Sequence, residues 1–262
     1  MRIKKPSILQ VMTSSTDDGS ILLKQSRERG SMMQMALGTI LHRGLVCHTL
    51  CPESSHPPMA RRIHLPLMMR DHIPPADYPL ITEVFVNPDG ADAGREWIEL
   101  YNPGPELSIA GWTLGDAMHR GDYGDGRSAF PAGAQLSHGQ VIVAAACATD
   151  FSAAHGFNPS YEWTDCDAAV PDLSPVRSWE GFGIALGNTS DEVLLLDTGD
   201  ARVDSAAWGG TYRAGVTPFT DFTAPFPSGA SLKRYPPDAD RDDCARDFYT
   251  SHNPSPGRVA GN

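Results

Sequence analysis

The pattern of hydrophobic and polar residues changes near residue 78. From Ile81 onward, short apolar or alternating stretches are separated by turn residues every 8–12 positions. This spacing is typical of a β-sandwich, in which short antiparallel strands form two packed layers. Before residue 78, neither the helical nor the strand period is visible. We therefore expect an all-β domain over residues 78–262, preceded by a mostly disordered segment over residues 1–77.

Eight stretches of the second region predict strands, because they are rich in β-branched, aromatic or alternating apolar residues. They are residues 81–86, 96–101, 111–114, 140–146, 182–186, 191–197, 202–208 and 230–235. The sequence DTGDA joins two of them and predicts a hairpin turn. One short helix is expected over residues 149–156, with Thr149 or Asp150 as its cap and Gly156 at its end.

Residues 1–77 begin with basic residues, as a secretory signal does, but the apolar core of a signal does not follow. A second apolar stretch, MMQMALGTILHRGLVCHTLC, is interrupted by His42 and Arg43. Eight of the nine methionines lie in this region, and a translation start placed too far upstream would explain their clustering. We interpret residues 1–77 as a leader with little structure, either a wrongly assigned start or a degenerate export signal.

Charge is distributed unevenly along the chain, whose formal net charge is −11. Residues 1–77 hold 10 Lys and Arg against 6 Asp and Glu, whereas residues 78–262 hold 11 against 26, a net charge of −15. Because nucleic-acid affinity depends on neutralising phosphates with Lys and Arg, a nucleic-acid partner is not expected. The sequence contains no uncharged apolar run long enough to predict a transmembrane helix.

Three glutamates lie close together in the first two predicted strands: Glu83, Glu96 and Glu99. They could form a general acid and base, a metal site, or part of an ordinary strand surface. Since side chains alternate across a strand, Glu96 and Glu99 point to opposite faces, whereas paired catalytic carboxylates converge on one concave site. This alternation favours the structural interpretation.

The face of each residue in this strand follows from the same alternation. If Ile98 and Leu100 point into the core, Glu99 lies on the outer face, where we expect it to pair across strands with Arg95 or Lys233. Glu96 would lie at the strand entrance, accessible to solvent.

Alternating aspartates mark a turn in the sequence DADRDDCARD. The candidate ligands are Asp238, Asp240, Asp242, Asp243 and Asp247. Calcium-binding loops supply oxygen ligands in this way, but an EF-hand loop counted from Asp238 would need Gly and Glu where Asp243 and Tyr249 stand. We therefore expect a solvated acidic turn and no cofactor, with a calcium site as the alternative.

The second region holds three cysteines. Cys147 ends an apolar strand and is expected to pack as a small buried hydrophobe. Cys166 and Cys244 lie in acidic, turn-rich stretches, so in an oxidising compartment we expect a disulfide between Cys166 and Cys244. It would close a loop of about 80 residues and stabilise the fold by roughly 4 kcal/mol. The alternative is two free surface thiols in a cytosolic protein.

Motifs for catalysis are absent from the sequence. It contains no Gly-x-Ser-x-Gly, His-Glu-x-x-His or phosphate-binding loop, so no catalytic residue is assigned. The tripeptide Arg-Gly-Asp at 120–122 matches an adhesion motif, but a tripeptide arises easily by chance, and we treat it as coincidence.

Six stretches in order, ITEVFVNPDG, REWIELYNPG, LSIAGWTLGD, FPAGAQLSHGQVIVAA, LGNTSDEVLLLDTGDARVDSAAWG and GASLKRYPPDADRDDCARDF, resemble the bacterial lamin-tail domain. The resemblance covers about residues 79–257. It implies an immunoglobulin-like β-sandwich, often exported or at the cell surface, with no catalytic residues assigned to the module.

The resemblance and the residue patterns together predict a function. We expect a non-enzymatic interaction module, extracellular or in the cell envelope, that binds a protein or cell-surface ligand. One alternative is a metal-dependent hydrolase or nuclease that uses Glu83, Glu96, Glu99 or the aspartates of residues 238–247. A second is a calcium-binding adhesion module.

Overall fold

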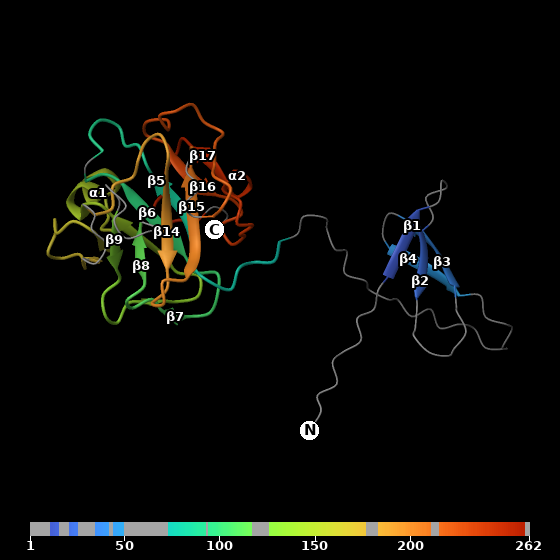
Figure 1. Ribbon diagram of the computed structural model, residues 1–262. Helices are drawn as coiled ribbons and strands as arrows, with labels where there is room; N and C mark the ends of the chain where they lie inside the picture. Colours follow the sequence, from blue (N-terminus) through green and yellow to red (C-terminus); the bar gives the residue numbers. More distant parts are fainter. Residues whose placement is uncertain are drawn as a thin grey trace, which may run out of the picture. The chain divides into compact units, whose positions relative to one another are not determined.

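The computed structural model divides the chain into two compact units, Met1–Met69 and Arg70–Asn262 (Figure 1). The structure describes residues 73–92, 94–116, 126–176, 183–210 and 215–259, together with the backbone of four strands in the first unit.

The first unit contains a four-stranded antiparallel sheet in the order β1-β2-β3-β4. Its strands are β1 (Val11–Ser15), β2 (Ile21–Gln25), β3 (Met35–Leu41) and β4 (Gly44–Thr49). The sequence predicted no strand here, and this expectation is corrected for these four segments. The apolar stretch interpreted as an interrupted signal core is two paired strands separated by two residues, a spacing typical of a hairpin.

The second unit is built on two main sheets (Figure 1). The six-stranded sheet has the order β12 (Tyr161–Glu162), β11 (Val141–Ala145), β6 (Trp97–Tyr101), β5 (Leu80–Phe85), β16 (Ser231–Arg234) and β17 (Phe248–Ser251). The five-stranded sheet has the order β13 (Ser174–Pro175), β9 (Arg127–Ala129), β8 (Thr113–Gly115), β14 (Asp191–Leu196) and β15 (Arg202–Trp208). A small sheet pairs β10 (Gln135–Leu136) with β7 (Leu107–Ser108).

One hydrophobic core lies between the two main sheets. It joins Ile98 and Leu100 of β6 and Leu232 of β16 to Leu114 of β8 and Val193 of β14, all with almost no exposed surface. Sheets that bury one face each against a shared core form a β-sandwich. The predicted all-β sandwich is therefore confirmed, and so is the prediction that Ile98 and Leu100 point into the core.

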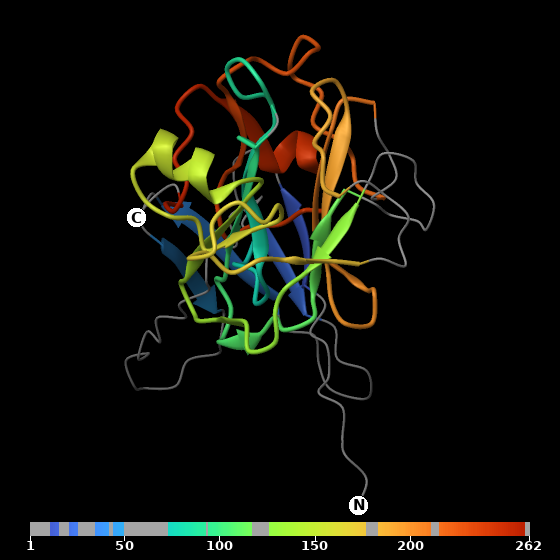
Figure 2. The same cartoon turned by 90° about the vertical axis from the view of Figure 1, so that its left-hand side faces the viewer.

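The other face of the six-stranded sheet carries a second, smaller cluster. Trp97, Val143 and Ala145 pack there with Phe151 of helix α1 (Ala148–His155), which lies on the side of this sheet away from the five-stranded sheet (Figure 2). The alternation of side chains along β6 therefore serves two apolar clusters, one on each face.

Most of the predicted elements are present. The hairpin β14–β15 forms, and α1 ends at Gly156, whose φ of 79° is left-handed as expected of a helix-terminating glycine. The helix begins after Cys147, earlier than the expected caps Thr149 or Asp150. The sequence missed six short strands (β7, β9, β10, β12, β13 and β17) and helix α2 (Cys244–Asp247).

The strand predicted over residues 182–186 is wrong where the structure describes it. Its amides do not join a sheet but donate to carboxylates: Ala185 N to Asp116 at 2.9 Å and Leu186 N to Glu96 at 3.4 Å. Gly187 N, which follows, donates to Asp191 at 2.6 Å. Three side chains therefore take the place of a neighbouring strand.

Candidate functional site

Glu83 and Glu99 lie face to face on the outer side of the six-stranded sheet. They are cross-strand partners on β5 and β6, and neither side chain has any exposed surface. A bulge between Ile81 and Glu83 adds one residue to β5 and places Thr82 beside the pair. The predicted outer-face position of Glu99 is thus confirmed, but that face is buried.

The partner predicted for Glu99 is wrong, because the lysine pairs with the other glutamate. Lys233 Nζ lies 2.9 Å from Glu83 Oε2, and Lys233 is the cross-strand partner of Glu83 in β16. Glu83 Oε1 also accepts hydrogen bonds from Ser231 Oγ at 2.5 Å and from Ser255 N at 3.1 Å. Arg95 instead donates to the backbone oxygen of Asp89.

Glu99 is held by neutral donors. Its Oε1 accepts from Thr82 Oγ1 at 2.7 Å, and its Oε2 accepts from Gly257 N at 2.7 Å and Arg258 N at 3.2 Å. Burial, together with the charge of Glu83, raises the pKa of Glu99 to about 7.

Glu96 is the third glutamate of the group, and it lies apart from the other two. We expected solvent to reach it at the strand entrance, but only 7 % of its surface is exposed. Burial raises the pKa of Glu96 to about 8, with further contributions from the charges of Asp92, Asp116 and Asp191. It holds the Leu186 amide in the loop between β13 and β14, so its role in the structure is to position this loop.

These contacts bear on the hydrolase alternative. Glu83 and Glu99 share a face, but their oxygens accept hydrogen bonds from groups of the same chain, and Glu96 serves a separate loop. A hollow of about 550 Å³ lined by Thr189, Phe222 and neighbouring residues contains none of the three glutamates. Within the described part of the chain, the acids therefore do not converge in one concave pocket.

Three of the five aspartates proposed as calcium ligands, Asp240, Asp242 and Asp247, form ion pairs with arginines. Arg234 lies 3.3 Å from Asp240 and 3.5 Å from Asp247, and Arg241 lies 2.6 Å from Asp247. Arg202 pairs with Asp242 at 2.8 Å. Since these ion pairs occupy oxygens that a cation would need, they favour the alternative of an acidic turn; calcium binding itself stays a prediction.

Arg234 links the two sheets from within the sandwich. Its Nη2 donates to both oxygens of Asp204 in β15, at 3.0 and 2.9 Å, and its Nε donates to the Ile81 carbonyl of β5. Asp204 Oδ2 in turn accepts from the Ile81 amide at 2.6 Å. Buried charges of this kind are tolerated only when fully paired, which is why three aspartates gather around one guanidinium.

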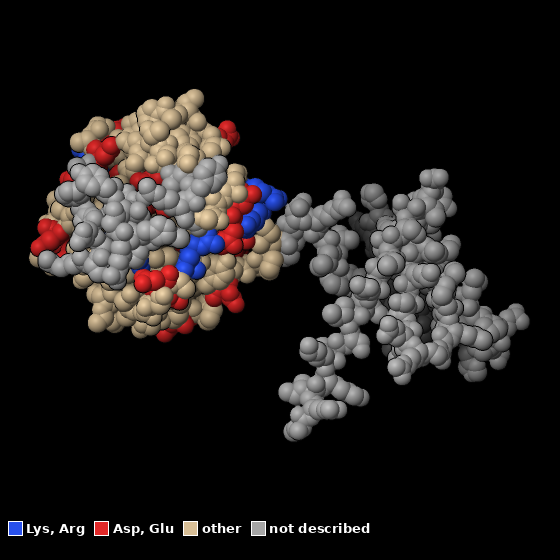
Figure 3. All heavy atoms as spheres, in the orientation of Figure 1, with Lys and Arg blue, Asp and Glu red and all other residues tan. Residues whose placement is uncertain are grey.

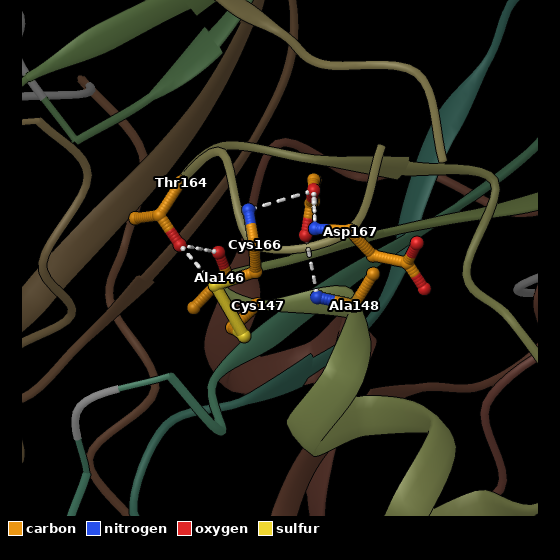
Figure 4. The surroundings of a disulfide bond; sticks show 7 residues. Ala146, Cys147, Ala148, Thr164, Cys166 and Asp167 are labelled. Carbon is orange, nitrogen blue, oxygen red and sulfur yellow. Dashed lines mark hydrogen bonds between the residues drawn. A yellow bond between two sulfur atoms is a disulfide. The ribbon is translucent and has the colours of Figure 1, made fainter. Parts of the chain in front are cut away.

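The predicted Cys166–Cys244 disulfide is wrong. The structure joins Cys147 to Cys166, 19 residues apart in sequence with Cα atoms 5.4 Å apart, and leaves Cys244 as a buried free thiol (Figure 4). Helix α2 turns Cys244 inward against β15, where its sulfur accepts from the Ala207 amide. Burial raises the pKa of this thiol to about 12.

A buried glutamate that the sequence analysis missed holds the disulfide in place. Glu162 has no exposed surface and accepts hydrogen bonds from the amides of Ala148 at 2.6 Å, Cys166 at 3.0 Å and Asp167 at 2.7 Å (Figure 4). It therefore caps the start of α1 and positions the loop that carries Cys166. The one sequence feature that could have pointed to this role is that Glu162 stands four residues before Cys166, in a stretch otherwise rich in turn residues.

Cys147, Glu162 and Cys166 also form a group of three potential metal ligands, the one such group among the residues that the structure describes. All of their ligand atoms lie within 4.8 Å of one another. The two sulfurs are bonded to each other, and the Glu162 carboxylate accepts hydrogen bonds from three backbone amides. These atoms are therefore not available to a metal ion while the disulfide is intact.

The surface of the second unit is acidic. Lys and Arg occupy little of the face shown in Figure 3, and the larger basic areas lie beside Asp and Glu. Lys233 and Arg234 are buried, and Arg127 is 3 % exposed, so these cations contribute little to the surface. The Arg-Gly-Asp tripeptide lies outside the described residues. No helix in the described parts of the chain has the length and apolar character needed to cross a membrane.

Two packed sheets that share one core, antiparallel except for the parallel pair β11–β12, form an immunoglobulin-like β-sandwich module whose buried glutamates are hydrogen-bonded within the chain. The profile of the Lamin Tail Domain family matches residues 74–210, just over half of the 262 residues. The chain belongs to the lamin tail domain family, which confirms the resemblance. A search of curated proteins found no match. Strands β16 and β17, the latter missed from the sequence, lie beyond the matched residues.

Proposed function

We propose that this chain is a non-enzymatic interaction module of an exported or envelope-associated protein, and that it binds a protein or cell-surface ligand. The observation that carries the proposal is the internal use of the glutamates. Glu83 and Glu99 are buried and accept hydrogen bonds from seven donor groups of the chain itself. Carboxylates in this state stabilise a fold and are not placed to meet a substrate.

The cysteines support export. Disulfides persist in oxidising compartments and are rare in the cytosol. The Cys147–Cys166 bond closes a segment that contains both α1 and β12. The charge of residues 78–262 supports a ligand other than nucleic acid, because a net charge of −15 repels phosphates.

An assay with matched variants tests the absence of catalysis. The wild-type chain is offered phosphodiester and peptide substrates with Mg²⁺, Mn²⁺, Ca²⁺ or Zn²⁺, alongside Glu83→Gln, Glu96→Gln and Glu99→Gln. We expect no turnover by any of them. A wild-type activity that disappears in one variant whose melting temperature is unchanged would contradict the proposal.

Export is tested separately in the native host. Fractionation followed by peptide mapping without reduction should find the chain outside the cytosol with Cys147 joined to Cys166. A cytosolic chain with both thiols free would contradict this part.

A further inference from the structure

The segment after β17 forms a strap over the outer face of the six-stranded sheet. This strap, residues 252–259, buries Pro256 and Val259 and lays its backbone against the Glu83–Glu99 pair. Gly257 has a left-handed φ of 79°, and a Cβ there would lie 3.4 Å from the ring of Phe157. Gly257 therefore has a backbone conformation that favours glycine, and its Cα side faces Phe157 of the loop after α1.

Polar contacts between strap and sheet concentrate on the two carboxylates. Ser255 N and Oγ reach Glu83 at 3.1 and 3.3 Å, and the amides of Gly257 and Arg258 reach Glu99 Oε2 at 2.7 and 3.2 Å. Lys233 Nζ also donates to Ser255 Oγ. Closure of the strap therefore removes both glutamates from water.

The buried pair has an excess of negative charge. Two carboxylates stand opposite each other on neighbouring strands, an arrangement that like charges destabilise. Lys233 forms an ion pair with Glu83, whereas no described Lys or Arg forms one with Glu99. Closing the strap over two ionised glutamates thus buries one negative charge that no cation balances.

The hydrogen bonds of Glu99 leave a place for a proton. Its Oε2 keeps the two amide donors of the strap in either state. A proton on Oε1 can be donated to Thr82 Oγ1 across 2.7 Å, because a hydroxyl that donates to a carboxylate can turn and accept from a carboxylic acid. The closed strap is therefore compatible with a neutral Glu99.

We propose that the strap is a proton-linked latch, which closes most tightly when Glu99 holds a proton and loosens when both glutamates are ionised. In the open state the carboxylates regain water, so the proton is released on opening. The surface uncovered by opening consists of Glu83, Glu99 and Lys233 on the sheet.

The direction and pH window follow from linkage. Burial raises the pKa of Glu99 from the usual 4.5 of a glutamate to about 7 in the closed state. A group whose pKa is higher in the closed state favours that state as the pH falls, so closure strengthens between about pH 7 and pH 4.5 and is constant above. The charged or titratable groups around it are Glu83 from β5, Lys233 from β16 and His155 from α1, and burial lowers the pKa of His155.

Hydrogen exchange of the full chain tests the latch. We would follow the amides of Gly257 and Arg258 from pH 5 to pH 8.5 by mass spectrometry, each corrected by the rate of the same peptide in unfolded protein. Protection should fall by up to about tenfold per pH unit between pH 5 and pH 7 and then level off. Glu99→Gln should stay protected with no pH dependence.

Two reference variants set the limits of the measurement. Gly257→Ala should loosen the strap at every pH, because a φ of 79° is unfavourable for alanine. Glu106→Gln, at an exposed glutamate, should match the wild type. A flat wild-type profile, protection that increases with pH, or the same profile in Glu99→Gln would overturn the proposal. If Glu99→Gln does not fold, the pH profiles of the wild type and Glu106→Gln are used instead. A fall in protection between pH 5 and pH 7 in both supports the latch, and a flat profile in both overturns it.

Discussion

The disulfide provides the sharpest prediction, because sequence and structure choose different partners for Cys166. We predict that Cys166→Ser destabilises the domain by removing the Cys147–Cys166 link. The two cysteines are 19 residues apart, and on the chain-entropy model a loop of this length corresponds to about 3 kcal/mol in the free energy of unfolding. Serine is close to cysteine in size and Cys166 is exposed, so lost packing contributes little to the decrease in the free energy of unfolding.

Urea unfolding with and without a thiol reductant measures this effect. The wild type should lose about 3 kcal/mol on reduction, and Cys166→Ser should start at the lower value and be insensitive to the reductant. Cys244→Ser is the matched variant: it alters the buried free thiol but should keep the sensitivity to reduction. Loss of that sensitivity in Cys244→Ser would refute the assignment and restore the Cys166–Cys244 pairing.

Peptide mapping gives an independent result. Trypsin leaves Cys147 and Cys166 together in residues 128–177 and releases Cys244 in residues 242–246. Without reduction, we expect the longer peptide to be lighter by two hydrogens and the shorter one to carry a free thiol. A covalent complex of the two peptides would contradict the structure.

Three further predictions concern charge and the first unit. Arg234→Met should cost about 3–5 kcal/mol in urea unfolding, because it removes the guanidinium that pairs with buried Asp204 and Asp247 and with half-buried Asp240. Arg202→Gln at an exposed pair should cost at most about 1 kcal/mol, and equal losses would contradict this. Because burial raises the pKa of Glu96 to about 8 and of Asp116 to about 7, the folded state binds more protons than the unfolded state, so thermal stability should rise as the pH falls from about 8 to about 5. A melting temperature that increases with pH over this range would disprove it. Deletion of Met1–Met69 should leave the melting temperature of the second unit unchanged, since that unit has its own core; a large decrease would show that the first unit stabilises it.

The sequence alone determined the local structure of the second unit. Alternation placed Ile98 and Leu100 in the core and Glu99 on the opposite face, and turn residues separated most of the strands correctly. These features depend on neighbours within a few positions, so a pattern along the chain reveals them. In the first unit, β3 and β4 are separated by only two residues, so along the chain they resemble one interrupted apolar segment, and the pattern does not reveal the hairpin.

The partners of the polar side chains were decided by tertiary structure. Lys233 forms its ion pair with Glu83 and not with Glu99 because β16 pairs with β5 in a register that sets Lys233 opposite Glu83. Cys166 meets Cys147 because β12 runs parallel to β11, next to the start of α1, while α2 turns Cys244 into the core.

The burial of the glutamates has the same origin. No pattern within β6 indicates that residues 252–259 cover its outer face, or that carboxylates hold the loop at residues 185–187. Whether an acid on a strand is solvated, paired or kept neutral depends on segments that are distant in sequence and close in space. For that reason the sequence predicts where Glu99 points, and only the folded chain decides what surrounds it.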